Sequence, residues 1–292
     1  MRRFAPPFAA GVLLIASAAS AQQAPLLRYG FDEPGGQALD TGTPPPLPGD
    51  LMGGAVRSGN TPSGSGSSVD FNGDAPYAHV LGGESDKLDG LSQLTLTTWL
   101  NLSAYAPPTT GTGNQRLVAK QAGTTFGGFN WSLNATPNDG PVGPDNVRLG
   151  IFLGNNINSA AGNFTSAFST ADIDAASKWV FLAVTYDSTR ASENAAFYIG
   201  GVDTPVQSLG NLVSLSQLMV DGGVARFGVG FTDAAAATDT SLKGFQDDVR
   251  VYGSALDLAA LETVRLSNVP EPASPGLVLM GGATLLARRR RA

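Results

Sequence analysis

Hydrophobic and polar residues alternate in short runs along most of this chain, and turn-forming residues separate the runs. The clearest run is 93–102, where the even-numbered leucines fall on one face and Thr95, Thr97, Trp99 and Asn101 on the other. The run 178–187 is apolar at consecutive positions, which is typical of a central strand covered on both faces. The pattern therefore predicts a protein built mainly from strands.

The other runs complete this prediction. Strands are expected at 26–31, 67–71, 77–80, 93–102, 116–120, 129–134, 147–153, 178–187, 195–199, 224–229 and 245–252. A short helix is expected at 257–265, with Leu258, Leu261 and Leu266 on its apolar side. The 37 Gly and 19 Pro residues and the charged fraction of 14% favour strands and turns over a helical bundle.

Residues 1–21 predict a signal peptide. Arg2 and Arg3 precede a short apolar run, and Ala19 and Ala21 frame a small-residue cleavage site for signal peptidase. The remaining body, residues 22–268, has the length of one all-β sandwich domain.

Residues 269–292 form a second processing signal in three parts. The motif Val269, Pro270, Glu271 and Pro272 comes first, a weakly apolar stretch 273–287 follows, and Arg288, Arg289, Arg290 and Arg291 end the signal. The arginines resist translocation, while the apolar stretch is expected to form a short helix in the membrane. The stretch is shorter than the roughly 20 residues of a spanning helix, so we expect only transient membrane contact and release of the mature protein.

This tail resembles the PEP-CTERM sorting signal of Gram-negative bacteria. The resemblance implies that an exosortase recognises Pro270, Glu271 and Pro272. It also implies export across the inner membrane and delivery to the cell surface or extracellular matrix.

Composition and charge narrow the function. The chain has no cysteine, which excludes disulfides, thiolate metal sites and cysteine nucleophiles. Six of the 18 basic residues lie in the two end segments, whereas all 24 acidic residues lie between Asp32 and Glu271. The body is therefore strongly acidic, which disfavours nucleic acid and anionic lipid as partners and favours divalent cations.

Six motifs in order resemble the laminin-G-like family of the concanavalin A-like lectin/glucanase fold. They are YGFDE (29–33), VDFNGD (69–74) followed by Tyr77, LTLTTWL (94–100), WVFLAVTYD (179–187), FYIGG (197–201) and GFQDDVRVY (244–252). The resemblance implies an all-β, two-sheet antiparallel jelly-roll sandwich with one concave face. Departures from the family pattern are Val180, Phe181, Gly200 and Gln246.

Asp247 is the carboxylate with the most informative position. Strand alternation places it on the same face as Phe245, Val249 and Val251, where a carboxylate needs a cation or several hydrogen-bond donors. Some members of the family bind calcium, and Asp32 is a candidate second ligand. The alternative is a structural carboxylate that accepts backbone N–H groups. No other cofactor is expected.

Other features bear on catalysis and on ligand binding. The run Glu84 to Asp89 resembles the paired carboxylates of glucanases with this fold, but its glycines predict a loop that cannot hold catalytic geometry. Sugars stack on exposed aromatic rings, and Trp99 and Trp131 are the candidate platforms. Trp179, Phe181 and Tyr252 are assigned to the core.

The sequence thus favours an exported, non-enzymatic binding module for glycan or another surface polymer. A structural matrix protein without a discrete ligand site is the alternative. A glycoside hydrolase or lyase of the same fold is a third candidate.

Overall fold

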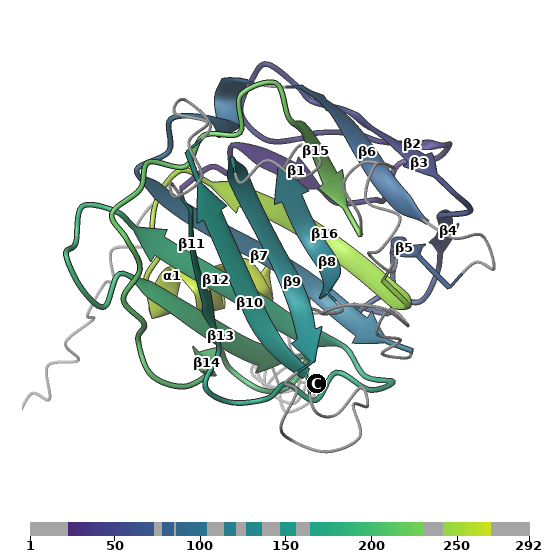
Figure 1. The fold of residues 1–292 in the computed structure, drawn as a ribbon. Helices are drawn as coiled ribbons and strands as arrows, with labels where there is room; N and C mark the ends of the chain where they lie inside the picture. The colour runs from purple at the N-terminus through teal and green to yellow at the C-terminus, as the bar shows by residue number, and fades with distance from the viewer. Residues whose placement is uncertain are drawn as a thin grey trace, which may run out of the picture.

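A computed structural model describes residues 23–72, 78–84, 86–103, 114–120, 127–135, 147–155, 164–230 and 242–269. Within these residues the chain forms two antiparallel sheets, with the strand orders β14-β13-β12-β7-β16-β5-β4 in sheet A and β11-β10-β9-β8-β15-β6-β3-β2 in sheet B (Figure 1). Strand β1 also pairs with β16 at the side of sheet A. The predicted all-β sandwich with one short C-terminal helix is confirmed.

The strands of sheet A are β1 (Leu27–Tyr29), β4 (Val56–Ser58), β5 (Ser68–Asp70), β7 (Gln93–Leu102), β12 (Val180–Asp187), β13 (Ala195–Gly201), β14 (Gln207–Ser208) and β16 (Gly244–Tyr252). Those of sheet B are β2 (Gln37–Ala38), β3 (Gly49–Met52), β6 (His79–Glu84), β8 (Asn114–Lys120), β9 (Gly128–Ala135), β10 (Val147–Gly154), β11 (Phe164–Phe168) and β15 (Arg226–Val229). The helices are the 3-10 turn η1 (Asp86–Leu88) and α1 (Leu258–Leu266). Short strands β2, β3, β4, β11 and β14 were not predicted, because two to five residues give too little alternation to recognise.

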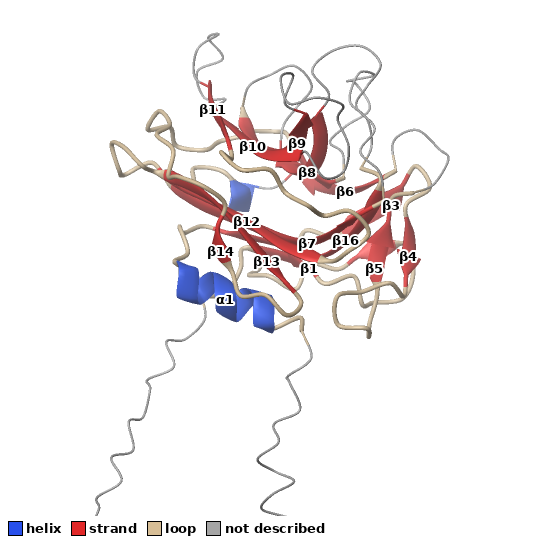
Figure 2. Ribbon diagram, turned by 90° about the horizontal axis from the view of Figure 1, so that it is seen from below, coloured by secondary structure: helices blue, strands red, loops and turns tan. Residues whose placement is uncertain are grey.

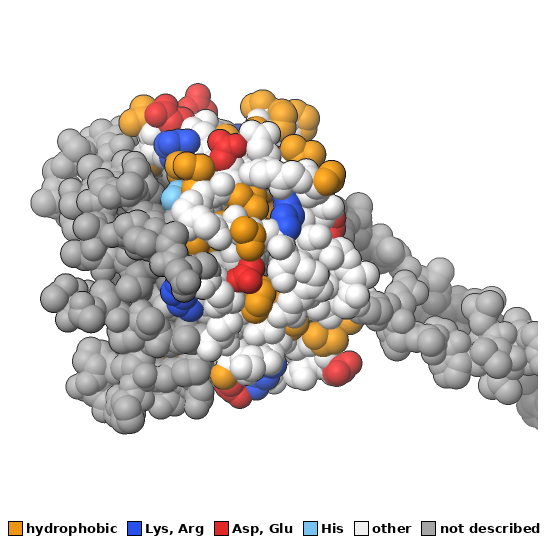
Figure 3. Space-filling model, turned by 90° about the vertical axis from the view of Figure 1, so that its right-hand side faces the viewer, with side chains coloured by type: hydrophobic (Ala, Val, Ile, Leu, Met, Phe, Trp, Pro, Cys, Tyr) orange, Lys and Arg blue, Asp and Glu red, His pale blue; other side chains and the backbone are white. Residues whose placement is uncertain are grey.

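The sandwich has two hydrophobic cores. The larger core lies between the sheets and includes Leu96, Leu182 and Trp131. The smaller core lies where α1 covers the opposite face of sheet A, and it contains Trp99, Phe181, Ala183, Val206, Tyr252, Leu261 and Val264 (Figure 2). Strand β12 is buried at every position but its last, as its apolar sequence predicted. The edge of the sandwich on the side of β2 to β6 carries apolar side chains scattered among charged ones (Figure 3).

Helix α1 begins as the sequence predicted but turns a different side to the protein. The side chain of Asp257 caps the helix by accepting the N–H of Ala260 at 2.8 Å. Leu261 is buried, whereas Leu258 and Leu266 are each 48% exposed. The expected apolar side is therefore wrong at those two positions, because Val264 takes the buried place beside Leu261.

A bulge in β16 changes which side chains face the core. Between Asp247 and Arg250 the register with β7 gains one residue, and Asp248 there has a positive φ of 47°. Asp247 pairs with Trp99 on the α1 side of sheet A, whereas Val249 and Val251 belong to the core between the sheets. The predicted common face of Asp247, Val249 and Val251 is therefore wrong, because the bulge reverses the alternation.

The two predicted processing signals lie mostly outside the described residues. The residues left outside include Ala19 and Ala21 of the predicted signal peptide, and Pro270 to Pro272, the apolar stretch and Arg288 to Arg291 of the predicted tail. Val269 is the last described residue and packs against the smaller core. Both ends of the described chain lie on the α1 side of sheet A (Figure 2). No helix in the described part of the chain is long and apolar enough to cross a membrane.

Candidate functional site

The two tryptophans expected to bind sugars are both inaccessible. Trp99 is 0% exposed beneath α1, where its ring meets Phe181 edge-on at 5.6 Å between centroids. Trp131 is also 0% exposed and lies between the sheets. Neither ring offers a free face, so both assignments as stacking platforms are wrong. Strand alternation placed each side chain on a face, but it did not show that both faces are covered.

The outer face of sheet B is not an open binding surface among the described residues. Asn130, Ser132 and Asn134 alternate along β9 with core residues and so point away from the core, yet each is nearly fully buried. Partly exposed aromatic rings occur only toward the edge strand β11. There Phe168 is 42% exposed and packs edge-on against Phe152, with 5.7 Å between the ring centroids.

An open groove instead lies at the edge of sheet A, with a volume of about 590 Å³. One wall is the segment that leads into β12, and the other is the end of β13 with the turn that leads to β14. Trp179 lines the groove together with Val180, Ile199, Val202 and Leu209. Its remaining lining includes Asp172, Asp174, Lys178, Asp203 and Gln207. A pocket with an apolar floor and a few polar groups is the usual form of a small-ligand site.

Contacts on two sides hold Trp179 in place. Its indole Nε1 donates a hydrogen bond to Oδ1 of Asn60 at 3.0 Å. Its ring also lies against Phe245, at 6.5 Å between centroids and an interplanar angle of 51°. The side chain is only half-buried. A partly exposed, pre-oriented tryptophan in a groove is suited to stack against a sugar ring.

The assignment of Trp179 to the core is therefore wrong in part. The residue packs against the smaller core but also lines the groove. Its sequence signal was weak, because it sits one position before β12 in an apolar run. Its partner Asn60 lies 119 positions away along the chain.

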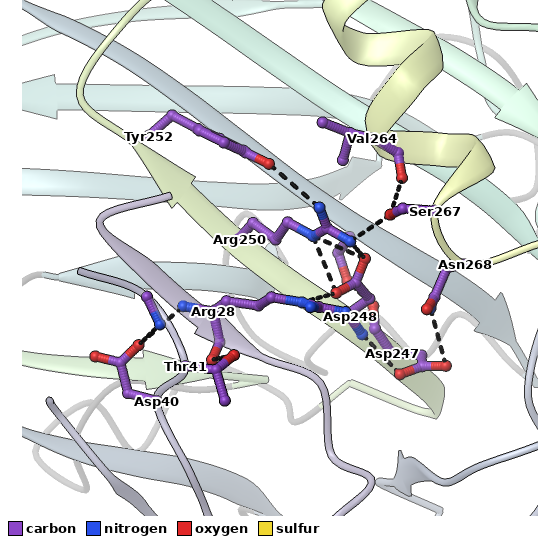
Figure 4. Close-up of polar contacts among 12 residues, drawn as sticks. Arg28, Asp40, Thr41, Asp247, Asp248, Arg250, Tyr252, Val264, Ser267 and Asn268 are labelled. Atoms are coloured by element: carbon purple, nitrogen blue, oxygen red, sulfur yellow. Dashed lines mark hydrogen bonds and ion pairs between the residues drawn. The ribbon is translucent and has the colours of Figure 1, made fainter. Parts of the chain in front are cut away.

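The other candidate residues, Asp32 and Asp247, lie close enough for the charge of Asp32 to act on the Asp247 carboxyl. Each is next to a residue in the left-handed backbone region. Asp32 follows Phe31, where φ is 59°, and Asp247 precedes Asp248, where φ is 47°. Asp32 Oδ1 accepts the N–H of Ser67 at 2.9 Å. Asp247 Oδ1 accepts the N–H of Asp248 at 2.7 Å, and Asn268 lies 3.5 Å from its other oxygen (Figure 4).

Gly66 is required for this arrangement. Its φ of +80° is strained for other residues, and a Cβ there would lie 2.2 Å from Oδ1 of Asp32. The segment 60–67 thus contacts Asp32 at one end and Trp179 at the other. It connects the carboxylate pair to the groove.

Burial and like charge raise the pKa of the Asp247 carboxyl to about 8. Burial is the largest cause, and the charges of Asp248 and then Asp32 add to it. The nearby arginines do little to lower the pKa of Asp247, because they form ion pairs with Asp248 instead. Arg28 Nε lies 2.8 Å and Arg250 Nη2 2.6 Å from the oxygens of Asp248.

The predicted glucanase-like run is divided between different contacts. Glu84 ends strand β6 and is exposed, which corrects the expectation that it lies in a loop. Asp89 binds Lys120 Nζ at 2.7 Å and the N–H of Gly222 at 2.7 Å. Asp89 is thus engaged in structural contacts.

Comparison with solved structures identifies the fold. The chain resembles a botulinum neurotoxin type C structure whose cell entry depends on two ganglioside molecules, with a TM-score of 0.54 and 12% identity over 84% of this chain and 51% of that one. It also resembles domain 4 of AbnA, an arabinanase of Geobacillus stearothermophilus, in complex with arabinotriose, with a TM-score of 0.52 and 15% identity over 84% and 100%. A third similar structure is a Trypanosoma rangeli sialidase, with a TM-score of 0.51 and 15% identity over 84% of this chain and 33% of the sialidase chain.

At these identities the likeness shows a shared concanavalin A-like jelly-roll fold. The chain spans about half the length of the toxin structures but the whole of the arabinanase domain. No protein-family model matches the sequence, and no curated protein matches it.

The raised pKa of Asp247 predicts a pH-dependent stability in metal-free buffer. The folded protein keeps a proton up to about pH 8 that the unfolded chain releases near the ordinary value of 3.8. The stability from this group is complete below that lower value and is lost as the pH rises toward 8. The loss amounts to at most about 1.4 kcal/mol of unfolding free energy per pH unit. It should be absent in Asp247→Asn, because the amide does not ionise. Urea unfolding at several pH values with chelator measures the effect, and parallel stability curves for the two proteins would contradict it.

Proposed function

We propose that this protein is a non-enzymatic glycan-binding module of the laminin-G-like type, with its ligand in the groove at the edge of sheet A. The half-buried ring of Trp179 is the observation that carries the proposal. The fold supports it, because similar structures were solved with arabinotriose or with N-acetylneuraminic acid bound. A purely structural matrix protein would not need an oriented aromatic ring in an open groove.

Trp179→Ala tests the glycan proposal. Loss of the stacking surface should weaken binding at least tenfold, which corresponds to about 1.4 kcal/mol. A glycan array identifies a bound glycan, and calorimetric titration then compares the variant with the unchanged protein. Circular dichroism and a melting curve verify that the variant is folded.

Phe168→Ala is the matched control, because it removes a partly exposed ring from sheet B. It should leave binding unchanged. If Phe168→Ala abolishes binding and Trp179→Ala does not, the ligand lies on sheet B and the groove proposal is wrong. Failure to bind any glycan on the array would favour the structural matrix role.

A divalent cation, with calcium the natural choice, is our second proposal for the Asp32 and Asp247 pair. Two nearby carboxylates whose charges repel one another are stabilised by a cation between them. Calcium prefers six to eight oxygen ligands. The described residues contain no group of three or more metal-ligating side chains, so carbonyl and water oxygens would supply the remainder.

Thermal melting tests the calcium proposal. Calcium at a hundred times its dissociation constant should add about 2.7 kcal/mol of stability. For a domain of this size that raises the melting temperature by about 5–10 °C. Asp247→Asn should abolish the shift. Equal melting temperatures in calcium and in chelator would leave Asp247 as a structural carboxylate.

We also propose that the protein is exported and sorted by an exosortase through Pro270, Glu271 and Pro272. The order of motif, apolar stretch and arginines supports this. Signal peptidase would act on the other end, and the mature protein would reach the cell surface or extracellular matrix.

Glu271→Ala in the full chain tests the sorting route in a Gram-negative host that carries an exosortase. The variant should keep its C-terminal peptide and stay with the cell membrane, whereas the unchanged protein should lose the peptide. Mass spectrometry of the C-terminus in each cell fraction measures this. Ser274→Ala, just outside the motif, is the control. Equal processing of all three proteins would exclude recognition of the motif.

A further inference from the structure

The groove at the edge of sheet A is acidic. Three carboxylates line it, from Asp172, Asp174 and Asp203, against the single ammonium group of Lys178. Lys178 forms an ion pair with Asp174, so its charge is partly balanced within the groove. Its hydrogen bond holds the pKa of the Asp174 carboxyl below the usual value, so that carboxylate stays ionised.

Asp203 is the carboxylate that remains for a ligand. Asp172 pairs with Arg148 at 3.1 Å, whereas Asp203 is exposed and has no ion pair with any described residue. Asp203 lies in the turn between β13 and β14, where the N–H of Gly201 is bonded to the carbonyl of Thr204 at 2.9 Å.

This turn is held firmly against helix α1. The Arg265 guanidinium donates to the carbonyls of Gly201 and Val202 at 2.7 and 2.9 Å. The side chain of Arg265 is itself 5% exposed and also binds Glu262. The backbone that carries Asp203 is thus fixed in the free protein, which lowers the entropic cost of using its carboxylate in binding.

The groove therefore combines a stacking ring, Trp179, with an unpaired negative charge, Asp203. A sugar that places a C–H face on the ring and a protonated amine near the carboxylate satisfies both features. A sugar with a carboxylate or sulfate group would meet like charge. Extending the proposed glycan function, on which this inference rests, we propose that the groove selects glycans bearing protonated amines and rejects acidic glycans.

Three β-1,4-linked hexasaccharides of equal length test this inference by calorimetric titration: glucosamine, glucose and glucuronic acid oligomers. The glucosamine oligomer should bind at least tenfold more tightly than the glucose oligomer, and the glucuronic acid oligomer should bind most weakly. Raised salt should reduce the preference for the amine, since the charges are partly exposed.

Two variants separate groove recognition from general attraction to an acidic protein. Asp203→Asn should lower glucosamine binding to the level of the glucose oligomer. Asp86→Asn removes another exposed carboxylate, on η1 and outside the groove, and should change nothing. Trp179→Ala should abolish binding of both oligomers.

The outcomes distinguish this inference from the proposed function. Equal binding of the glucose and glucosamine oligomers, lost in Trp179→Ala, overturns the amine preference and keeps the glycan function. Equal effects of Asp203→Asn and Asp86→Asn also overturn it, because the attraction would then be nonspecific. Binding of none of the three oligomers overturns the inference, while the glycan array decides the wider function independently.

Discussion

The α1 side of sheet A depends on the ion pairs that the buried carboxylate of Asp248 forms with two arginines. Its side chain is 1% exposed and binds Arg28 on β1 and Arg250 on β16. Arg250 extends the network to Ser267 at the end of α1, at 2.6 Å (Figure 4). One carboxylate thus joins the terminal strand, the central sheet and the helix. Breaking a buried pair by removing one partner typically costs about 3–5 kcal/mol, because the other charge stays buried.

The same residue also determines where the neighbouring carboxylate points. The left-handed backbone at Asp248 adds one residue to β16 and reverses its alternation. Val249 and Val251 then fill the core, and Asp247 is left on the α1 side without an arginine of its own. The crowding of Asp247 with Asp32 follows directly from the bulge. Burying the Asp247 carboxyl near two other carboxylates costs free energy, as its raised pKa indicates. This cost is tolerated because the ion pairs of Asp248 fix the backbone around it.

The groove depends on long-range contacts of a similar kind. Asn60 fixes the indole of Trp179 from the segment 60–67, and Gly66 in that segment lets Asp32 approach closely. Arg265 fixes the opposite wall through the turn that carries Asp203. The carboxylate pair, the groove and the helix are therefore linked to one another through these contacts. Its polar chemistry differs from that of sheet B, whose outward polar residues on β9 are nearly fully buried.

The sequence by itself determined the long strands, the capped helix α1 and the acidic character of the body between the two end segments. These properties are local, since alternation, capping and charge are all readable from neighbouring residues. Only the tertiary structure decided which tryptophan is accessible, because burial depends on what covers each face. Trp99 and Trp131 are fully covered, whereas Trp179 lies at an open edge. The bulge at Asp248 was equally hidden, since a carboxylate in left-handed geometry is stabilised by arginines that only folding brings to it.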